Sequence, residues 1–369
     1  MIYLDSAATS LIKPASVERA VLQAMRTMAS PGRGGYAASF RAAETVYACR
    51  EAAATLLHVN DPSRVIFTMN ATHGLNLAIR SLVRPGTRVV ISGFEHNAVT
   101  RPLHAVGADV RVAGTRLFAP EELLESWDTA LREAEVAVCT QVSNVFGFVL
   151  PMDELSALCR KHGVKLIVDA SQSAGVLPVD MEKWQAAFVA MPGHKGLLGP
   201  QGTGILLCGE NGEPLMYGGS GAESRMQSMP ASLPEHLEAG TQNVCGIAGL
   251  LAGIRFVAEK GTERIFAHEH KLLQTALASL RDSGLTLFTG EEGTQSGVLS
   301  LRAEGLDCEE LAAALAEKGV CVRAGLHCAP RAHESAGTLE TGTLRMSFSP
   351  FLTEEEVQKA CALLLQEIR

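Results

Sequence analysis

The chain has 369 residues, of which 47% are hydrophobic and 5% aromatic, and its formal net charge is −8. This length predicts two domains, and the composition is typical of an α/β enzyme and not of a disordered or fibrous protein. The negative charge argues against a nucleic-acid partner, because binding to phosphate backbones requires a basic surface.

The sequence contains no long apolar run and no recognisable export signal. No stretch of about 18 apolar residues occurs, so we expect no membrane-spanning helix. The N-terminal residues MIYLDSAATS lack a basic segment followed by an apolar core, so we expect a cytoplasmic protein. Nine cysteines are scattered without a CxxC pair, which argues against a metal site and favours buried thiols for Cys139, Cys159 and Cys208.

Short apolar runs alternate with helical patterns from about residue 15 to 210. We predict strands at 65–68, 88–92, 108–113, 136–142, 165–170, 186–191 and 204–208. Several are continuously apolar, as expected for strands buried on both faces of a parallel sheet. Helical patterns at 74–83, 120–135 and 153–163 lie between them. The sequence therefore predicts repeated βαβ units and a sheet with helices on both sides.

A glycine-rich polar stretch at 217–242 interrupts this alternation. A long helical pattern follows at 244–280, and strand, helix and strand patterns come after it. The chain ends with a Gly/Thr-rich segment at 337–343 and a helical pattern at 353–368.

This change of pattern predicts the domain division. We assign residues 15–245 to a large domain. Residues 1–14 and 246–369 are assigned to a smaller α+β domain.

Polar residues follow the predicted strands, where ligands of parallel sheets gather. The set comprises Thr72 in MNATHG, His96 in GFEHNA, Asn144 in SNVFG, Asp169 and Gln172 in DASQS, and His194 and Lys195 in PGHKG. Small residues before a helix at 69–74 predict an anion site. The sequence thus predicts one site at this edge of the sheet.

Lys195 follows an apolar run and lies between Gly193 and Gly196. Glycine permits close approach of the backbone, and an ammonium group in a partly apolar pocket loses its proton readily, as a Schiff-base lysine requires. Taken alone, such a lysine is more often an ordinary loop residue. With an anion site, an imidazole, an amide and the carboxylate of Asp169 nearby, it fits the needs of pyridoxal phosphate (PLP).

In their order, the motifs of this chain resemble those of the class V aminotransferase family of fold type I PLP enzymes, and most closely cysteine desulfurases and selenocysteine lyases. The resemblance runs through YLDSAATS, RGGYAAS, TMNATHGLN, EHNA, QVSNVFG, VDASQSAG, GHKGLLGPQGTG, EAGTQN, RAGLHCAP and LRMSFSPF. It implies an α/β fold whose large domain has a mainly parallel seven-stranded sheet flanked by helices, with a smaller α+β C-terminal domain. It also implies PLP as cofactor.

For the cofactor ring, the resemblance assigns four residues. Lys195 would form the Schiff base and remove the α-proton of the substrate. Asp169 would pair with the pyridine nitrogen and Gln172 with the ring hydroxyl. His96 would stack on the ring and transfer protons.

For the phosphate and the substrate, the resemblance assigns five more residues. Thr72 and His194 would bind the phosphate. Thr241 would reach the phosphate of the other subunit, which implies a homodimer. Asn144 and Arg345 would hold the substrate carboxylate.

Two positions depart from the family pattern. Pro192 stands where serine is common, and proline offers a phosphate neither a hydroxyl nor an N–H. His73 replaces a frequent glutamate. Considered without the resemblance, His96 could be a solvent-facing helix residue, Asp169 a helix cap and Arg345 a surface arginine.

The residue that selects the reaction is Cys328 in RAGLHCAP. Glycine and proline around it indicate a loop, and positive charge from Arg323 or His327 would favour the thiolate. The resemblance implies that Cys328 takes sulfur from L-cysteine as a persulfide, releases L-alanine and passes the sulfur to an acceptor protein, as in desulfurases with a similarly short interval from the cysteine to Arg345.

Several alternatives stay open at this point. Cys328 could be an inert loop cysteine. The chain could be a selenocysteine lyase that acts on L-selenocysteine, or another class V aminotransferase or lyase. A non-catalytic binding protein with a PLP fold is a further alternative, although retention of the lysine and its neighbours argues against it.

Overall fold

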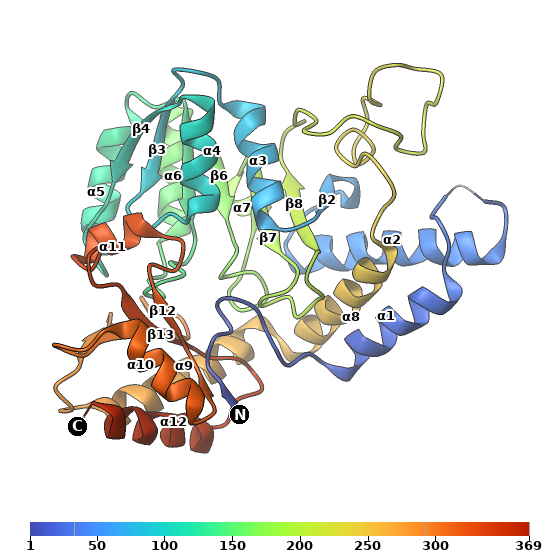
Figure 1. The fold of residues 1–369 in the computed structure, drawn as a ribbon. Coiled ribbons are helices and arrows are strands. Elements are labelled where there is room, and N and C mark those ends of the chain that lie inside the picture. The colour runs from blue at the N-terminus through green and yellow to red at the C-terminus, as the bar shows by residue number, and fades with distance from the viewer. Residues whose placement is uncertain (33, 292, 369) are drawn as a thin grey trace.

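The computed structural model of the protein describes residues 1–32, 34–291 and 293–368. A seven-stranded sheet in the order β2-β8-β7-β6-β5-β3-β4 forms its centre (Figure 1). The strands are β2 (Val65–Thr68), β3 (Arg88–Ser92), β4 (Asp109–Ala113), β5 (Val136–Thr140), β6 (Lys165–Asp169), β7 (Phe188–Pro192) and β8 (Gly204–Cys208). β8 runs antiparallel to both of its neighbours, β2 and β7, and the other adjacent pairs of this sheet are parallel. The predicted mainly parallel seven-stranded sheet is confirmed.

Helices cover both faces of this sheet. The helices between residues 15 and 184 are α1 (Ala15–Thr27), α2 (Ala37–Leu56), the 3-10 helix η1 (Pro62–Arg64), α3 (Ala71–Leu82), α4 (Asn97–Val106), α5 (Pro120–Leu131), α6 (Met152–His162) and α7 (Met181–Trp184). One apolar cluster includes Trp127 of α5 and residues of α2 and α6, and another includes Leu75 of α3 and Val99 of α4. Burying the apolar faces of these two helix layers against the largely apolar strands stabilises this arrangement.

The C-terminal part of the chain adds further helices and a separate four-stranded antiparallel sheet. Its elements are α8 (Val244–Lys260), α9 (Thr262–Leu280), β9 (Thr286–Phe288), β10 (Val298–Arg302), α10 (Cys308–Glu317), β11 (Val320–Cys321), β12 (Arg323–Gly325), α11 (Pro330–Ala336), β13 (Thr343–Ser347) and α12 (Glu354–Glu367). The predicted helical pattern at 244–280 is two helices, because Gly261 has a φ of +84° that ends the first one.

The N-terminal segment belongs spatially with this C-terminal part, and Figure 1 shows the N-terminus beside the red and orange elements. Strand β1 (Ile2–Tyr3) pairs with β11, and Ile2 and Leu4 join an apolar cluster otherwise built from residues 272–364. Helix α8 packs on α1 and α2. The domain boundary near residue 245 stays a prediction.

The helices of the described chain also bear on the membrane question. None of them combines the length and the apolar character needed to cross a bilayer.

Cys139, Cys159 and Cys208 are buried, as predicted.

Candidate active site

One cavity at the carboxyl ends of the parallel strands brings most of the predicted site residues together. Seven of them line it: Thr72, His96, Asn144, Asp169, Gln172, His194 and Lys195. Thr140 and Pro192, which end β5 and β7, line it as well. Their convergence follows from the topology, since parallel strands end at the same edge of a sheet. Their individual roles stay predictions.

Lys195 lies just beyond β7 and is half-buried. Burial lowers the pKa of its ammonium group to about 8, although the nearby Asp169 carboxylate opposes this change. The flanking glycines are required by packing: a Cβ on Gly196 would lie 2.4 Å from the carbonyl oxygen of Ala174, and one on Gly193 would lie 2.2 Å from Thr203 Oγ1. The lysine is therefore held in a tight turn in a partly desolvated setting, where its neutral amine forms readily.

Asp169 ends β6, where it pairs with Thr140 of β5, and it is only 3% exposed. Its Oδ1 accepts a hydrogen bond from the backbone N–H of Ser171 at 2.9 Å. Asp169 caps no helix, because the turn that follows β6 is not helical. A buried carboxylate needs a cationic or hydrogen-bonding partner, and this one faces the cavity that Lys195 shares.

His96 is the N-cap residue of α4. Its Nδ1 accepts a hydrogen bond from the backbone N–H of Ala98 at 3.0 Å, so the proton of the neutral ring lies on Nε2. Burial lowers the pKa of His96 to about 4, despite the opposing attraction of Asp169. The ring is therefore uncharged near neutral pH, and it lines the cavity.

Glu95, beside His96, did not stand out in the sequence. Its Oε1 accepts hydrogen bonds from Ser92 Oγ at 2.5 Å and from the backbone N–H of Thr140 at 2.8 Å, while its Oε2 is buried without a partner among the described residues. Burial raises the pKa of this carboxyl to about 8. The sequence feature that could have identified Glu95 is an acidic residue just after a predicted strand, between Phe94 and His96.

The phosphate residues predicted from the sequence lie at the N-terminus of α3 and beside it. Ala71 and Thr72 of its first turn line the cavity, and backbone N–H groups at such a terminus attract anions. His194 Nδ1 lies 3.0 Å from Thr9 Oγ1, and burial lowers the pKa of His194 to about 4. His73, the departure from the family pattern, accepts a hydrogen bond from the backbone N–H of Met69 at 3.3 Å.

Thr241 does not line this cavity in the single chain described. It is exposed and lines a neighbouring hollow together with Met69 and His73. Its loop is anchored by Glu238, which forms a 2.5 Å ion pair with the buried Arg50. The position of Thr241 on the surface is compatible with its predicted role toward a second copy of the chain.

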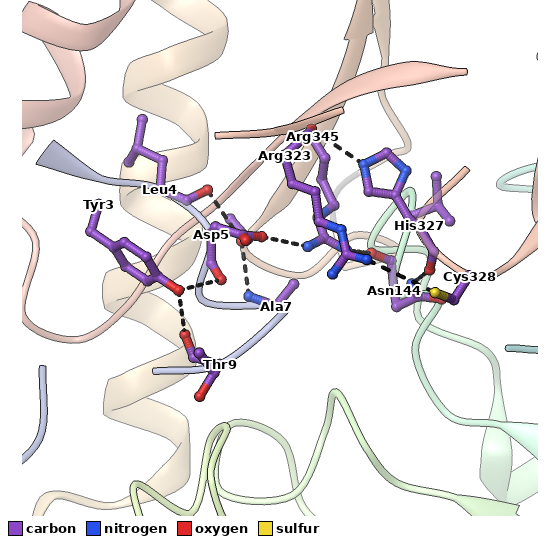
Figure 2. Close-up of polar contacts among 12 residues, drawn as sticks. Tyr3, Leu4, Asp5, Ala7, Thr9, Asn144, Arg323, His327, Cys328 and Arg345 are labelled. Atoms are coloured by element: carbon purple, nitrogen blue, oxygen red, sulfur yellow. Dashed lines mark hydrogen bonds and ion pairs between the residues drawn. The ribbon is translucent and has the colours of Figure 1, made fainter. Parts of the chain in front are cut away.

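Arg345 of β13 is 1% exposed, so it is not a surface arginine. Its Nη1 donates to the carbonyl oxygen of Asn144 at 2.8 Å, and its Nη2 donates to Asp5 Oδ1 at 2.6 Å (Figure 2). The two residues predicted to hold a carboxylate thus touch each other. Sequence reasoning missed Asp5, because 340 positions separate it from Arg345 and no local pattern could pair them.

Cys328 is exposed and lies just before α11, at the edge of the same region. Figure 2 shows its sulfur near Arg323, whose Nη2 lies 3.9 Å from Sγ. His327 and Cys328 both have positive φ angles, 51° and 55°, which is an unfavourable backbone for two consecutive non-glycine residues. The Cys328 carbonyl accepts a hydrogen bond from the backbone N–H of Asn97 at 2.8 Å, which ties the loop to the residue after His96.

The expectation that His327 supplies positive charge to the thiol is wrong. Its ring is buried, with Nδ1 3.4 Å from His333 Nε2 and Nε2 3.3 Å from the carbonyl oxygen of Arg323. Burial, together with the charge of Arg345, lowers the pKa of His327 to about 2, so the ring is neutral. The cation next to Cys328 is Arg323.

Comparison with known proteins gives consistent results. The family model "Aminotransferase class-V" matches residues 2–360. A probable cysteine desulfurase of Methanothermobacter thermautotrophicus is 33% identical over 374 residues, covering 97% of this chain and 92% of the relative. A cysteine desulfurase of Escherichia coli O157:H7 is 32% identical over 345 residues, covering 89% and 84%. The apo structure of a cysteine desulfurase from Thermococcus onnurineus NA1 matches with a TM-score of 0.91 at 28% identity, covering 100% of this chain and 94% of the other.

Proposed function

Since the chain belongs to the aminotransferase class-V family, we propose that it is a PLP-dependent cysteine desulfurase that converts L-cysteine to L-alanine and leaves a persulfide on Cys328. The observation that carries this proposal is the exposed thiol of Cys328 beside Arg323, in a loop hydrogen-bonded to the rim of the cavity that holds Lys195. An aminotransferase has no use for a thiol at this place.

The side chains around the cavity suit PLP. The first turn of α3 offers N–H groups for a phosphate, Asp169 offers a buried carboxylate for a protonated ring nitrogen, and Lys195 offers an amine with a lowered pKa. In the same cavity, His96 would lie on the ring face, Gln172 would contact the ring hydroxyl, and Thr72 and His194 would bind the phosphate. When bound, PLP supplies an electron sink for charge that develops at the substrate Cα.

The side chains of the protein carry out the remaining steps. Arg345 and Asn144 hold the substrate carboxylate, and the amine of Lys195 removes the α-proton. The Cys328 thiolate attacks the substrate sulfur: the new S–S bond forms while the Cβ–S bond breaks, and the electron pair of that bond remains with the carbon fragment. Protonation of the fragment gives alanine. The persulfide passes to an acceptor protein, and Thr241 completes the phosphate site of a second copy in a homodimer.

An alanine-formation assay tests this function. The purified protein, reconstituted with PLP, is incubated with L-cysteine and a thiol reductant, and alanine and sulfide are measured. We expect equal amounts of both, and loss of both in Cys328→Ala, with the cofactor absorbance retained. Cys245→Ala, a partly exposed cysteine outside the cavity, is the matched control. The proposal fails if the wild-type protein forms no alanine, or if Cys328→Ala forms it at the wild-type rate.

The same assay separates the alternatives. A selenocysteine lyase would release alanine from L-selenocysteine and very little from L-cysteine. Turnover of another amino acid without alanine formation would identify a different class V activity. A preparation that takes up no PLP would support a binding protein.

A further inference from the structure

The N-terminal segment fixes the position of Asp5 next to β13. The backbone N–H of Ser347 donates to the carbonyl oxygen of Leu4 at 2.8 Å, and the N–H of Ala7 donates to Ser347 Oγ at 2.9 Å. Tyr3 Oη donates to the carbonyl oxygen of Asp5 at 3.1 Å. The backbone is therefore hydrogen-bonded both before and after Asp5, so the carboxylate of Asp5 points in a defined direction.

That carboxylate meets the guanidinium of Arg345. The ion pair is 2.6 Å long, with side-chain exposures of 1% for Arg345 and 20% for Asp5. Because Asn144 accepts from the other terminal nitrogen, the plane of the guanidinium is fixed by two acceptors that come from different parts of the chain. The guanidinium carries further N–H groups that these contacts do not use, and Nε is buried without a partner among the described residues.

The charges around this pair are unequal. Arg323 lies directly opposite Arg345 across β12 and β13, so two cations stand side by side. Burial lowers the pKa of Arg345. The charge of Arg323 lowers it further, whereas the charge of Asp5 raises it. Among the described residues, Asp5 is the acidic side chain within ion-pair distance of Arg345. With Asp5 as its one partner, the pair of arginines keeps a surplus positive charge that suits a substrate carboxylate.

We propose that Asp5 is a positioning residue of the substrate-carboxylate site, which holds the guanidinium of Arg345 in the orientation that binds the carboxylate. This inference rests on the role of Arg345 in the proposed function. It assigns to the N-terminal segment, at the opposite end of the chain from β13, a direct part in substrate affinity.

The test compares L-cysteine with L-cysteine methyl ester, which lacks the carboxylate. In Asp5→Asn holoenzyme, we expect KM for L-cysteine to rise about tenfold, with kcat within about twofold, since the charge-assisted bond that orients the Arg345 guanidinium is weakened to a neutral one. Turnover of the ester should stay within about twofold of the wild type. An unchanged or lowered KM for L-cysteine overturns the proposal, and so do equal losses for acid and ester, which would indicate general damage. Asp109→Asn, an exposed aspartate at the start of β4, is the matched control.

A double-mutant cycle with Arg345→Lys separates this inference from the proposed function. If Arg345 binds the carboxylate, Arg345→Lys raises KM for L-cysteine and spares the ester; if it does not, the role of Arg345 itself is refuted. When Asp5 acts through Arg345, Asp5→Asn adds less than about twofold in the Arg345→Lys background, whereas additive losses overturn the proposal. Should Asp5→Asn fail to fold, Asp5→Glu, which keeps the charge but moves it, is compared on the same two substrates with the same expectations.

Discussion

Asn144 donates a hydrogen bond from Nδ2 to the carbonyl oxygen of His327 at 2.8 Å, and this bond joins the cavity to the loop of Cys328. The donor lines the cavity and the acceptor immediately precedes the thiol. His327 has a positive φ of 51°, so the loop conformation requires support from outside itself. One amide thus both lines the cavity and supports the backbone of the loop that carries Cys328.

Replacement of Asn144 by alanine should therefore affect the loop as well as the substrate. We expect a rise of at least about tenfold in KM for L-cysteine, because a donor to a charged group is removed. We also expect faster amide hydrogen exchange at residues 326–329, because the buried carbonyl loses its donor. Exchange measured by mass spectrometry in the absence of substrate checks the second effect, with Asn60→Ala, an exposed loop residue, as control. Unchanged protection of the loop would contradict the structural role of Asn144.

Lys195 should react as a neutral amine at unusually low pH. Its pKa is lowered to about 8 by burial, so the amine is mostly protonated below that pH and mostly free above it. The rate at which the apo-protein takes up PLP should rise with pH and level off above about pH 8, whereas an exposed lysine would still gain near pH 10. The growth of cofactor absorbance gives this rate, and Lys195→Arg should show none. A profile that still rises steeply from pH 9 to pH 10 would contradict the burial argument.

Arg323 should promote the reactivity of Cys328, because its Nη2 lies 3.9 Å from Sγ and can stabilise the negative charge of the attacking sulfur. We expect Arg323→Gln to slow the alkylation of Cys328 by iodoacetamide several-fold at pH 7, as followed by mass spectrometry. His327→Gln should slow it less, since the ring of His327 is buried and uncharged. The reverse order of effects would restore His327 as the activating group.

The sequence predicted the sheet and its site edge well for a physical reason. Continuous apolar runs such as 186–191 mark strands buried on both faces, and the polar residues that follow them must meet where parallel strands end. Contacts between residues far apart in the sequence could not be predicted in this way. The contact of Asp5 with Arg345 depends on how the N-terminal segment lies along β13, and the neutral state of His327 depends on burial that neighbouring residues in sequence do not reveal.

The helix break at Gly261 shows a different limit. Apolar residues continue on both sides of Gly261, so the pattern at 244–280 predicts one continuous helix. A single glycine within a helix is tolerated, so it gives no clear sign of a break. In the structure, its φ of +84° lies where side-chain-bearing residues are disfavoured. Whether such a glycine breaks a helix is decided by packing: α8 contacts α1 and α2, while α9 contacts α12.

Glu95 leads to a prediction about stability and pH. Burial raises the pKa of its carboxyl to about 8, compared with about 4.3 in an unfolded chain. Between these values the folded state binds the proton and the unfolded state does not, so this group's contribution to the free energy of unfolding falls as pH rises through that window. Glu95→Gln stays neutral and keeps an acceptor for Ser92 and Thr140, and it should lose this dependence.

We therefore expect Glu95→Gln to gain stability relative to the wild type as pH rises from 5.5 to 8. Urea unfolding of both proteins at the two pH values measures the difference, and comparing them cancels the titration of every other group. Glu304→Gln, an exposed acid, should show a difference from the wild type that does not change with pH. A constant difference for Glu95→Gln would mean that its carboxyl is already ionised in the folded protein, and that the buried Oε2 has a partner that neutralises it.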